Sequence, residues 1–308
     1  MRVLNLVTTP RPFFNDQCES LRRLGIEVDT VQVPKRTPPT ESRSITDYLR
    51  FYPTVAKRAF RDQYDLVHAN FGNTVPFAFG QPRRPIVATL WGSDVMQKDE
   101  RIRKVNTWFA RECDAVVLPS ERMTDYYPYE YEYIPFGVDP RKFYPISKSQ
   151  ARKQVGWDED KTIVLFPYPG EREVKKLDVA QEVVSRADDD AVIKTLQGVP
   201  HAEVFQYMNA ADALLVTSRR ESGPMVVKEA ALCNVPVVST DVGFVSEVLS
   251  DIKNSYVCES KSELVNRLRE VLRGRVRSDG RKHVGEWRLE RMAERYVDVY
   301  HAALDRSG

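Results

Sequence analysis

Short runs of β-branched and apolar residues alternate with longer amphipathic stretches along the whole chain, and this alternation limits the fold more than any other feature. Parallel strands need a helix-length connection between them, so the pattern is typical of parallel sheets wrapped by helices. We expect strands at Arg2–Thr8, Ile26–Val33, Leu66–Ala69, Ile86–Leu90, Ala115–Leu118, Tyr133–Pro135, Thr162–Phe166, Ala213–Val216, Val235–Ser239 and Ser255–Cys258. We expect helices at Asn15–Leu24, Thr46–Arg61, Asp99–Glu112, Lys175–Ala187, Ala202–Ala210, Met225–Leu232, Lys261–Arg273 and Arg281–Leu304.

The length of 308 residues is enough for two domains, each with its own core. Between the two halves, residues 134–145 hold three prolines and a glycine, which break any regular element and predict a linker. We therefore expect an N-terminal domain at residues 1–145 and a second domain at 146–283. The last segment, 284–308, belongs to a long amphipathic helix that we expect to pack back on the first domain.

Composition excludes several classes of protein. A net charge of +2 argues against a dedicated nucleic-acid binder. The four cysteines form no CxxC pair, which favours reduced thiols in the cytoplasm over a zinc site or a disulfide framework. No apolar run approaches the roughly 20 residues of a membrane span. A small basic excess in residues 1–150, with Arg101-Ile102-Arg103-Lys104, permits peripheral contact with the inner face of a membrane, although a solvated helix face is the alternative.

The stretch 217–232 is the most informative part of the sequence, because it follows an apolar strand and opens a helix. Gly223 lets the backbone approach a ligand, Pro224 suits a first helical turn, and the free amides of Met225 and Val226 lie at the positive end of the helix dipole. Such an N-terminus can bind a diphosphate. The chain has only 14 glycines, so it depends less on glycine-rich phosphate loops than most phosphate binders.

Charged side chains near this stretch could complete a site at the carboxyl ends of the strands. Glu221 and Glu229 can accept the hydroxyls of sugar and ribose. Arg172 offers a bidentate fork for phosphate, and Lys175 or Lys176 adds a point charge. Taken alone, glutamates and lysines on an amphipathic helix are as often solvated surface.

Several motifs resemble those of the retaining glycosyltransferases of the GT-B fold, specifically family 4, the group 1 glycosyl transferases. Glu221 and Glu229 resemble its E-x7-E signature. Four stretches before this signature are similar to other motifs of the family and occur in the same order: Tyr64–Asn70, Trp91–Asp94, Ile134–Pro145 and Val199–Asp212. A fifth similar stretch, Asn234–Gly243, follows the signature. The resemblance implies a GT-B architecture, in which two Rossmann-like domains with parallel sheets face a central cleft.

The resemblance also implies the chemistry. A hexose or N-acetylhexosamine would be transferred from a UDP- or GDP-sugar to an acceptor hydroxyl. The anomeric configuration of the sugar would be retained, and no metal or other cofactor would be required. Glu221 would contact the donor sugar, while Arg172 and Lys175 would stabilise the departing diphosphate. Lys176 replaces Lys175 if the register slips by one. Glu229 would hold the ribose. The remaining donor contacts implied are backbone groups at Gly223, Pro224, Met225, Val226 and Val199.

On the acceptor side, the resemblance points to Trp91, Asp94, His68 and Arg11. The family's Gly-Gly loop after the first strand is here 8–14, a stretch without glycine, in which Arg11 could compensate. Trp91 stands where the family has histidine, and it could stack on a sugar or belong to the core. His68 and Asp94 have ordinary structural alternatives, a buried histidine and a helix cap. His201, His283 and His301 have no partners at catalytic spacing, so we expect surface or helix positions.

Two other functions remain open on the sequence. One is a nucleotide-sugar epimerase or hydrolase on the same fold, and the other is a non-catalytic module that binds sugar nucleotides or glycans. The acceptor, whether glycan, lipid-linked sugar or small molecule, is not specified by any motif.

Overall fold

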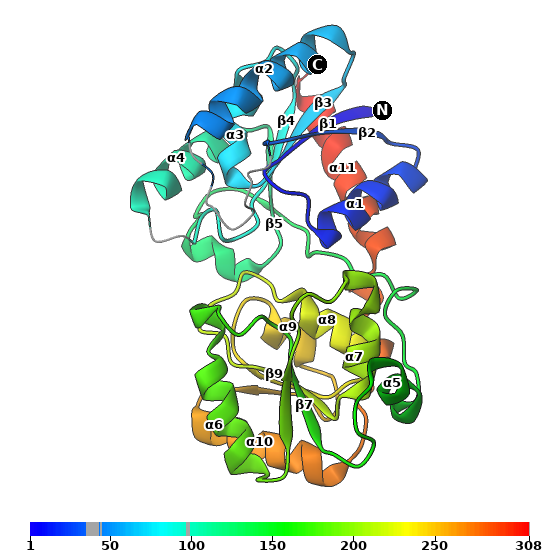
Figure 1. Ribbon diagram of the computed structural model, residues 1–308. Coiled ribbons are helices and arrows are strands. Elements are labelled where there is room, and N and C mark those ends of the chain that lie inside the picture. Colours follow the sequence, from blue (N-terminus) through cyan, green and yellow to red (C-terminus); the bar gives the residue numbers. More distant parts are fainter. Residues whose placement is uncertain (35–42, 44, 97–98, 308) are drawn as a thin grey trace. The chain divides into compact units, whose positions relative to one another are not determined.

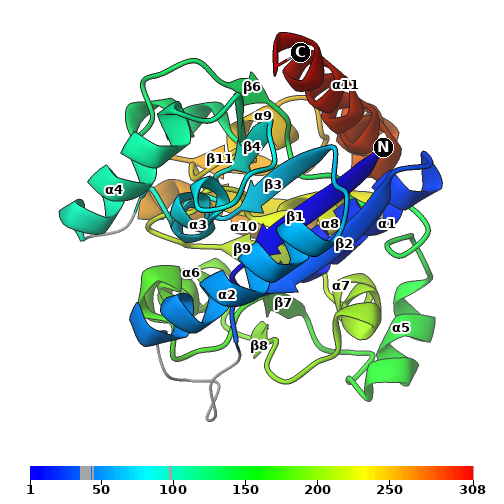
Figure 2. The same ribbon diagram turned by 90° about the horizontal axis from the view of Figure 1, so that it is seen from above.

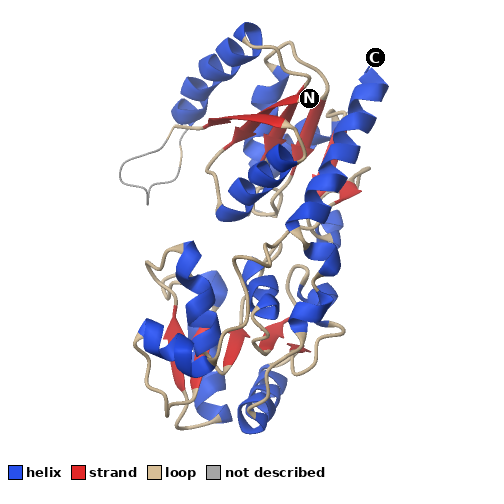
Figure 3. Cartoon of the chain, turned by 90° about the vertical axis from the view of Figure 1, so that its right-hand side faces the viewer, coloured by secondary structure: helices blue, strands red, loops and turns tan. Residues whose placement is uncertain are grey.

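The computed structural model describes residues 1–34, 43, 45–96 and 99–307 (Figure 1). The chain divides into two compact units, the first comprising Met1–Gly137 with Leu289–Gly308, and the second comprising Val138–Arg288. The division lies a few residues from the expected boundaries at 145/146 and 283/284. In each unit the strands lie between helices (Figure 3).

The first unit is built on a parallel sheet of six described strands in the order β2-β1-β3-β4-β5-β6. The strands are β1 (Arg2–Val7), β2 (Glu27–Gln32), β3 (Leu66–Asn70), β4 (Ile86–Thr89), β5 (Ala115–Leu118) and β6 (Glu132–Tyr133). The central strands β3, β4 and β5 are buried at every residue. Such continuous apolar runs are expected where helices cover both faces of a parallel sheet.

The helices of the first unit form two layers. They are α1 (Pro12–Arg23), α2 (Ile45–Arg61), α3 (Val75–Phe79), α4 (Glu100–Arg111) and α11 (Leu289–Ser307). Helix α1 packs beside α11, and α3 packs beside α4 (Figure 2). The last helix therefore completes the core of the unit that contains the first strand. Its buried face is formed by Leu289, Met292, Ala293, Tyr296, Val299, Tyr300 and Ala303.

The second unit has a parallel sheet of five described strands in the order β11-β10-β9-β7-β8. The strands are β7 (Ile163–Phe166), β8 (Val192–Thr195), β9 (Ala213–Val216), β10 (Val237–Thr240) and β11 (Tyr256–Cys258). The helices are α5 (Lys148–Val155), α6 (Leu177–Ala187), α7 (Val204–Ala210), α8 (Met225–Leu232), α9 (Val245–Leu249) and α10 (Lys261–Gly274). The expected α/β class with two parallel sheets is confirmed.

Two charged side chains hold the loops of the second unit in place. Arg152, only 1% exposed, pairs with Asp212 at 2.8 Å and also bonds the carbonyl of Ala210. Arg281 donates to the carbonyls of Phe143 and Pro140, which lie in the linker stretch 134–145. The motif around Asp212 therefore has a structural role in anchoring α5 to the start of β9.

Five elements differ from the sequence expectations, among them the short helices α3 and α9, which were not expected. β8 was not expected, because Lys194 and Thr195 face solvent at an edge of the sheet and leave only a short apolar run. α5 was also not expected; Ser147 caps its start and Gly156 ends it in the left-handed conformation. The last helix begins at Leu289 rather than at Arg281, because residues 280–287 form two 3₁₀ turns.

Candidate functional site

The candidate donor residues lie at the carboxyl ends of the strands in the second unit. From β7 the chain proceeds to β8 on one side, while β9 lies on the other, so the strand order reverses at β7. Ligands of open parallel sheets bind outside the carboxyl ends of the strands at such a reversal. Arg172 and Lys175 follow β7, and Glu221 follows β9. The sheet topology thus brings these three residues to the position where a ligand is expected.

Lys175 and Glu221 form a partly buried ion pair at this position. The ammonium of Lys175 donates to Oε1 of Glu221, and the Ser218 hydroxyl donates to the same oxygen at 2.9 Å. The side chains of Lys175 and Glu221 are only 5% and 13% exposed. Burial lowers the pKa of Lys175, and the Glu221 carboxylate opposes that shift.

Tyr168 forms the floor under this pair. The Lys175 ammonium lies 3.9 Å from the centroid of the Tyr168 ring, within the range of a cation–π contact. Burial and the nearby Glu221 carboxylate raise the pKa of Tyr168 well above its usual value. The phenol therefore stays neutral, so its ring can contact the ammonium without adding a second negative charge beside Glu221.

The two neighbouring lysines differ in backbone conformation and in contacts. Thr217 donates its hydroxyl to the carbonyls of Lys175 at 3.0 Å and Lys176 at 2.9 Å, which fixes this turn against the end of β9. Lys176 has a left-handed backbone, with φ of 58°, where it precedes α6. Lys175, and not Lys176, directs its side chain to Glu221. Arg172 lies exposed in the same loop.

The N-terminus of α8 supplies backbone donors next to the ion pair. Pro224 is the residue before the helix and provides no side-chain cap. The amide of Val227 bonds the carbonyl of Pro224, whereas the amides of Met225 and Val226 belong to the helix positions that have no intrahelical acceptor. Gly223 is required here for a packing reason, because a Cβ would lie 2.1 Å from the buried Phe244 ring.

Replacing Gly243 by alanine is expected to destabilise the fold by about 1–3 kcal/mol and to weaken anion binding. Gly243 has a φ of +56°, and a Cβ would lie 2.8 Å from the backbone of Ser222 in the loop before α8. Urea unfolding measures the first effect. Gly274→Ala is the matched control, because no atom lies within 4 Å of a Cβ at Gly274. Equal stability of the two variants would contradict this account.

Glu229 lies one helical turn after Met225 on α8 and is 5% exposed. Its Oε1 lies 2.9 Å from Nε2 of His201. His201 follows the loop that contains Val199, so the expected contacts for base and ribose lie on neighbouring segments. His201 lies in a 3₁₀ turn and is partly exposed, as expected, and it also has a carboxylate partner that its spacing in the sequence did not indicate.

In the first unit, aromatic side chains gather where the expected glycine loop is missing. The Trp91 ring lies 4.8 Å from Phe13 and 5.7 Å from Phe71, and Phe13 lies 4.4 Å from Phe136. Phe71 has a φ of 92°, a strained value for a bulky residue. Trp91 is 9% exposed, and its indole N–H has no acceptor in the described part of the chain. Arg11, in the same glycine-free stretch, is exposed.

His68 and Asp94 have structural partners. His68 is fully buried, and its ring nitrogens lie 2.7 Å from the hydroxyls of Tyr300 and Thr89. Burial lowers the pKa of His68 to about 3, so the ring stays neutral. Asp94 accepts hydrogen bonds from the amides of Gly72 and Trp91 and organises their loops. These contacts favour packing roles over contact with an acceptor.

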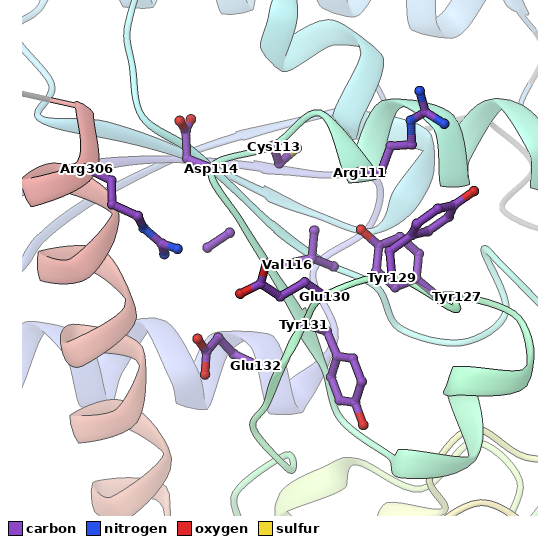
Figure 4. A pocket seen from close by; sticks show the side chains of 11 residues that line it. Arg111, Cys113, Asp114, Val116, Tyr127, Tyr129, Glu130, Tyr131, Glu132 and Arg306 are labelled. Atoms are coloured by element: carbon purple, nitrogen blue, oxygen red, sulfur yellow. The ribbon is translucent and has the colours of Figure 1, made fainter.

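A hollow of about 340 Å³ lies elsewhere in the first unit, at the start of β5 (Figure 4). It is lined by both acidic and basic side chains, including Arg306 from α11 and Glu130. Because it lies at the amino end of the strand, it is not part of the candidate site. Across the described residues, no cluster of three potential metal ligands occurs, and no helix is long and apolar enough to cross a membrane.

The two parallel-sheet units define a GT-B protein, and comparison with solved structures agrees. Sucrose-phosphate synthase (tll1590) from Thermosynechococcus elongatus superposes over 100% of both chains with a TM-score of 0.80 and 17% identity. Anabaena Alr3699/HepE in complex with UDP-glucose superposes over 98% of this chain and 100% of that chain, with a TM-score of 0.75 and 15% identity.

The sequence also matches two models of glycosyltransferase families. Residues 8–142 match the profile described as Glycosyltransferase Family 4, and residues 189–286 match Glycosyl transferases group 1. Together the two matches support a GT-B glycosyltransferase of family 4, in agreement with the family that the resemblance named.

Relatives with assigned activities are distant. A D-inositol 3-phosphate glycosyltransferase of Geodermatophilus obscurus is 27% identical over 213 residues, which cover 56% of this chain and 47% of that protein. An N-acetyl-alpha-D-glucosaminyl L-malate synthase of Bacillus anthracis is 23% identical over an alignment of 314 positions, which covers 82% of this chain and 79% of that protein. The match spans about half the length of the first two curated relatives.

The structure adds residues to the site that sequence reasoning missed: Tyr168, Ser218 and His201. Tyr168 and Ser218 follow apolar strands directly, and that position was the available signal. Their contacts with the Lys175–Glu221 pair depend on how the loops fold.

Proposed function

We propose that this protein is a retaining glycosyltransferase that moves a hexose or N-acetylhexosamine from a UDP- or GDP-sugar to an acceptor hydroxyl. The observation that carries the proposal is the Lys175–Glu221 pair, placed with Arg172 beside the N-terminus of α8 at the carboxyl ends of the strands. A cation, a carboxylate and free amides together suit a sugar that leaves a diphosphate.

Each group has a role in this proposal. Lys175, Arg172 and the amides of Met225 and Val226 neutralise the diphosphate as its bond to the sugar breaks. Glu221 orients Lys175 and accepts hydroxyls of the donor sugar. Because protein groups balance the charge, transfer needs no metal and continues in the presence of a chelator.

The nucleoside is held by a group one turn farther along α8 and by the loop that contains Val199. Glu229 accepts from the ribose, and the backbone near Val199 meets the base. The solved structure of Anabaena Alr3699/HepE holds UDP-glucose, which supports a nucleotide-sugar donor for this fold. The name of the Bacillus anthracis relative supports an N-acetylhexosamine as one candidate sugar.

For the acceptor, we propose contacts with Trp91 and Arg11. The indole N–H of Trp91 is a buried donor that has no acceptor among the described residues, and such a group is expected to find a partner in a ligand or water. A glycan, lipid-linked sugar or small molecule with a free hydroxyl is the proposed class.

We propose that the protein works at the inner face of a membrane, with α4 as the contact. Ile102, Val105 and Trp108 are 41%, 48% and 52% exposed at a spacing of three residues, among the basic residues of the same helix. The combined Val105→Ser and Trp108→Ser variant is expected to lose at least about fivefold in binding to vesicles containing phosphatidylglycerol.

Co-sedimentation with phosphatidylglycerol vesicles and with pure phosphatidylcholine vesicles measures this effect. Phe60→Ser is the control, because Phe60 on α2 is 69% exposed. Equal binding of all variants, or no preference for the anionic vesicles, would contradict contact through α4.

The test of the proposed function is turnover. UDP- and GDP-sugars are incubated with and without acceptors, with and without a chelator, and products are followed by NMR. Acceptor-dependent transfer with the donor's anomeric configuration, unchanged by the chelator, is expected. An epimer or free sugar formed from donor alone would instead assign an epimerase or hydrolase.

A second candidate is a non-catalytic module that binds sugar nucleotides or glycans. The glycine-free loop and the aromatic cluster around Trp91 favour it, because they occupy the region where the family has glycines and histidine. Binding of a sugar nucleotide with no turnover on any acceptor would support this candidate over the enzyme.

A further inference from the structure

His201 is held close to the carboxylate that we assign to the ribose. Its Nε2 lies 2.9 Å from Oε1 of Glu229. The Glu229 side chain is 6% exposed, whereas the His201 side chain is 36% exposed. The imidazole is thus partly open to solvent and also contacts a nearly buried carboxylate. It lies directly after the loop that contains Val199.

The imidazole is itself fixed. His201 begins a 3₁₀ turn directly after Pro200, whose ring restricts the backbone. Its ring contacts the buried Phe143 ring edge-on, with 5.4 Å between the ring centroids and an angle of 65° between the ring planes. Packing and backbone therefore determine the direction in which Nε2 points.

A carboxylate on a helix rotates freely about its last torsion unless a contact holds it. A donor at Oε1 removes that freedom before any ligand arrives, and it leaves Oε2 to accept from a hydroxyl. Groups that are ordered in advance bind ligands more tightly, because less entropy is lost on binding.

We propose that His201 is a positioning residue for nucleoside recognition: it holds Oε1 of Glu229 so that Oε2 accepts a hydrogen bond from a ribose hydroxyl. The proposal rests on the proposed function, because Glu229 must face the ribose. It predicts that His201 controls the preference for ribonucleotides over their deoxy forms, and that it acts through Glu229.

Calorimetry with UDP, 2′-deoxy-UDP and 3′-deoxy-UDP tests the proposal, with the GDP series used where GDP binds more tightly. Unmodified protein is expected to prefer the ribonucleotide by about tenfold over at least one deoxy form, the value of one hydrogen bond to a charged group. His201→Phe keeps the ring against Phe143 but removes the donor, and it is expected to reduce the preference to below about threefold.

Four variants make the result specific. Glu229→Ala is expected to abolish the preference, and adding His201→Phe to it is expected to change nothing more. His201→Gln, which can donate from its amide, should retain part of the preference. His283→Phe is the matched control, because His283 lies 3.6 Å from Asp279 and does not contact Glu229.

The outcomes separate this inference from the proposed function. If Glu229→Ala loses the ribose preference and His201→Phe keeps it, His201 has no positioning role. A uniform loss of affinity for all three nucleotides in His201→Phe, with the ratio unchanged, would assign His201 to packing and also overturn the inference. If unmodified protein binds neither UDP nor GDP, the proposed function itself fails.

Discussion

Replacing Lys175 by methionine is expected to lower the turnover number by two to three orders of magnitude, the usual cost of removing one group that stabilises developing charge. Methionine keeps an unbranched side chain over the Tyr168 ring but removes the ammonium that Glu221 orients. KM should change much less than kcat, because the lost interaction is strongest when the diphosphate departs. Steady-state kinetics with saturating acceptor measure the effect.

Two further variants serve as controls for the Lys175→Met prediction. Lys176→Met is expected to cost less than about tenfold, because Lys176 does not direct its side chain to Glu221. Lys161→Met removes an exposed lysine and should leave the rate unchanged. Equal losses at Lys175 and Lys176 would mean that the register of the basic pair is wrong.

Replacing Lys228 by methionine is expected to stabilise the protein at neutral pH. Lys228 is fully buried in α8, with its ammonium 4.1 Å from the Phe244 ring centroid and 5.6 Å from that of Trp287. Burial lowers the pKa of Lys228 to about 7, with Glu247 opposing the shift. A shift of this size corresponds to a penalty of about 5 kcal/mol for holding the folded lysine charged, from which all favourable contacts of the ammonium, including that with Glu247, must be subtracted.

The sign of the pH dependence follows from proton counts. Between about pH 7 and the unfolded value of 10.5, the unfolded lysine holds a proton that the folded lysine has released. Stability of the unmodified protein therefore rises with pH across this window. The advantage of Lys228→Met should be largest at pH 7 and below, and it should shrink towards pH 10.

Urea unfolding of both proteins between pH 6 and pH 10 measures this difference, with Lys161→Met as the exposed control. A difference in stability that does not vary with pH would show that Lys228 titrates alike in the folded and unfolded chain. A loss of stability at every pH would show that the contacts with Phe244 and Trp287 outweigh the cost of burial.

The sequence predicted the strands well, because buried parallel strands are short apolar runs and each one ended near its expected position. β8 was missed because an edge strand needs fewer apolar residues. The start of α11 was misplaced because an apolar pattern at helical spacing continues through the 3₁₀ turns before Leu289.

Within the site, sequence reasoning found the charged groups but not their partners. Glu221 and Lys175 were identified by motif and by their position after strands, yet their pairing joins residues 46 positions apart and depends on the sheet order. The burial of Lys228 was not predicted, because a lysine next to a glutamate on a helix usually lies on the solvated surface. His68 was assigned to the acceptor side by resemblance, and its bond to Tyr300 comes from a helix more than 200 residues away.

The small number of glycines now has a physical explanation in the donor unit. Gly223 and Gly243 allow the loop before α8 to pack closely against Phe244 and against its own backbone. In our proposal the diphosphate is bound by Lys175, Arg172 and the helix amides, which need no further glycine. In the first unit, the glycine-free stretch 8–14 contributes Phe13 to an aromatic cluster around Trp91.

We propose that the second unit binds a nucleoside diphosphate through Lys175 and the N-terminus of α8. Isothermal titration of UDP and GDP into the unmodified protein and into Lys175→Met tests it most directly. We predict saturable binding of at least one diphosphate by the unmodified protein, with affinity at least about tenfold weaker in the variant, the cost of one charge-assisted contact. Binding of neither nucleotide, or equal binding by both proteins, would contradict the claim.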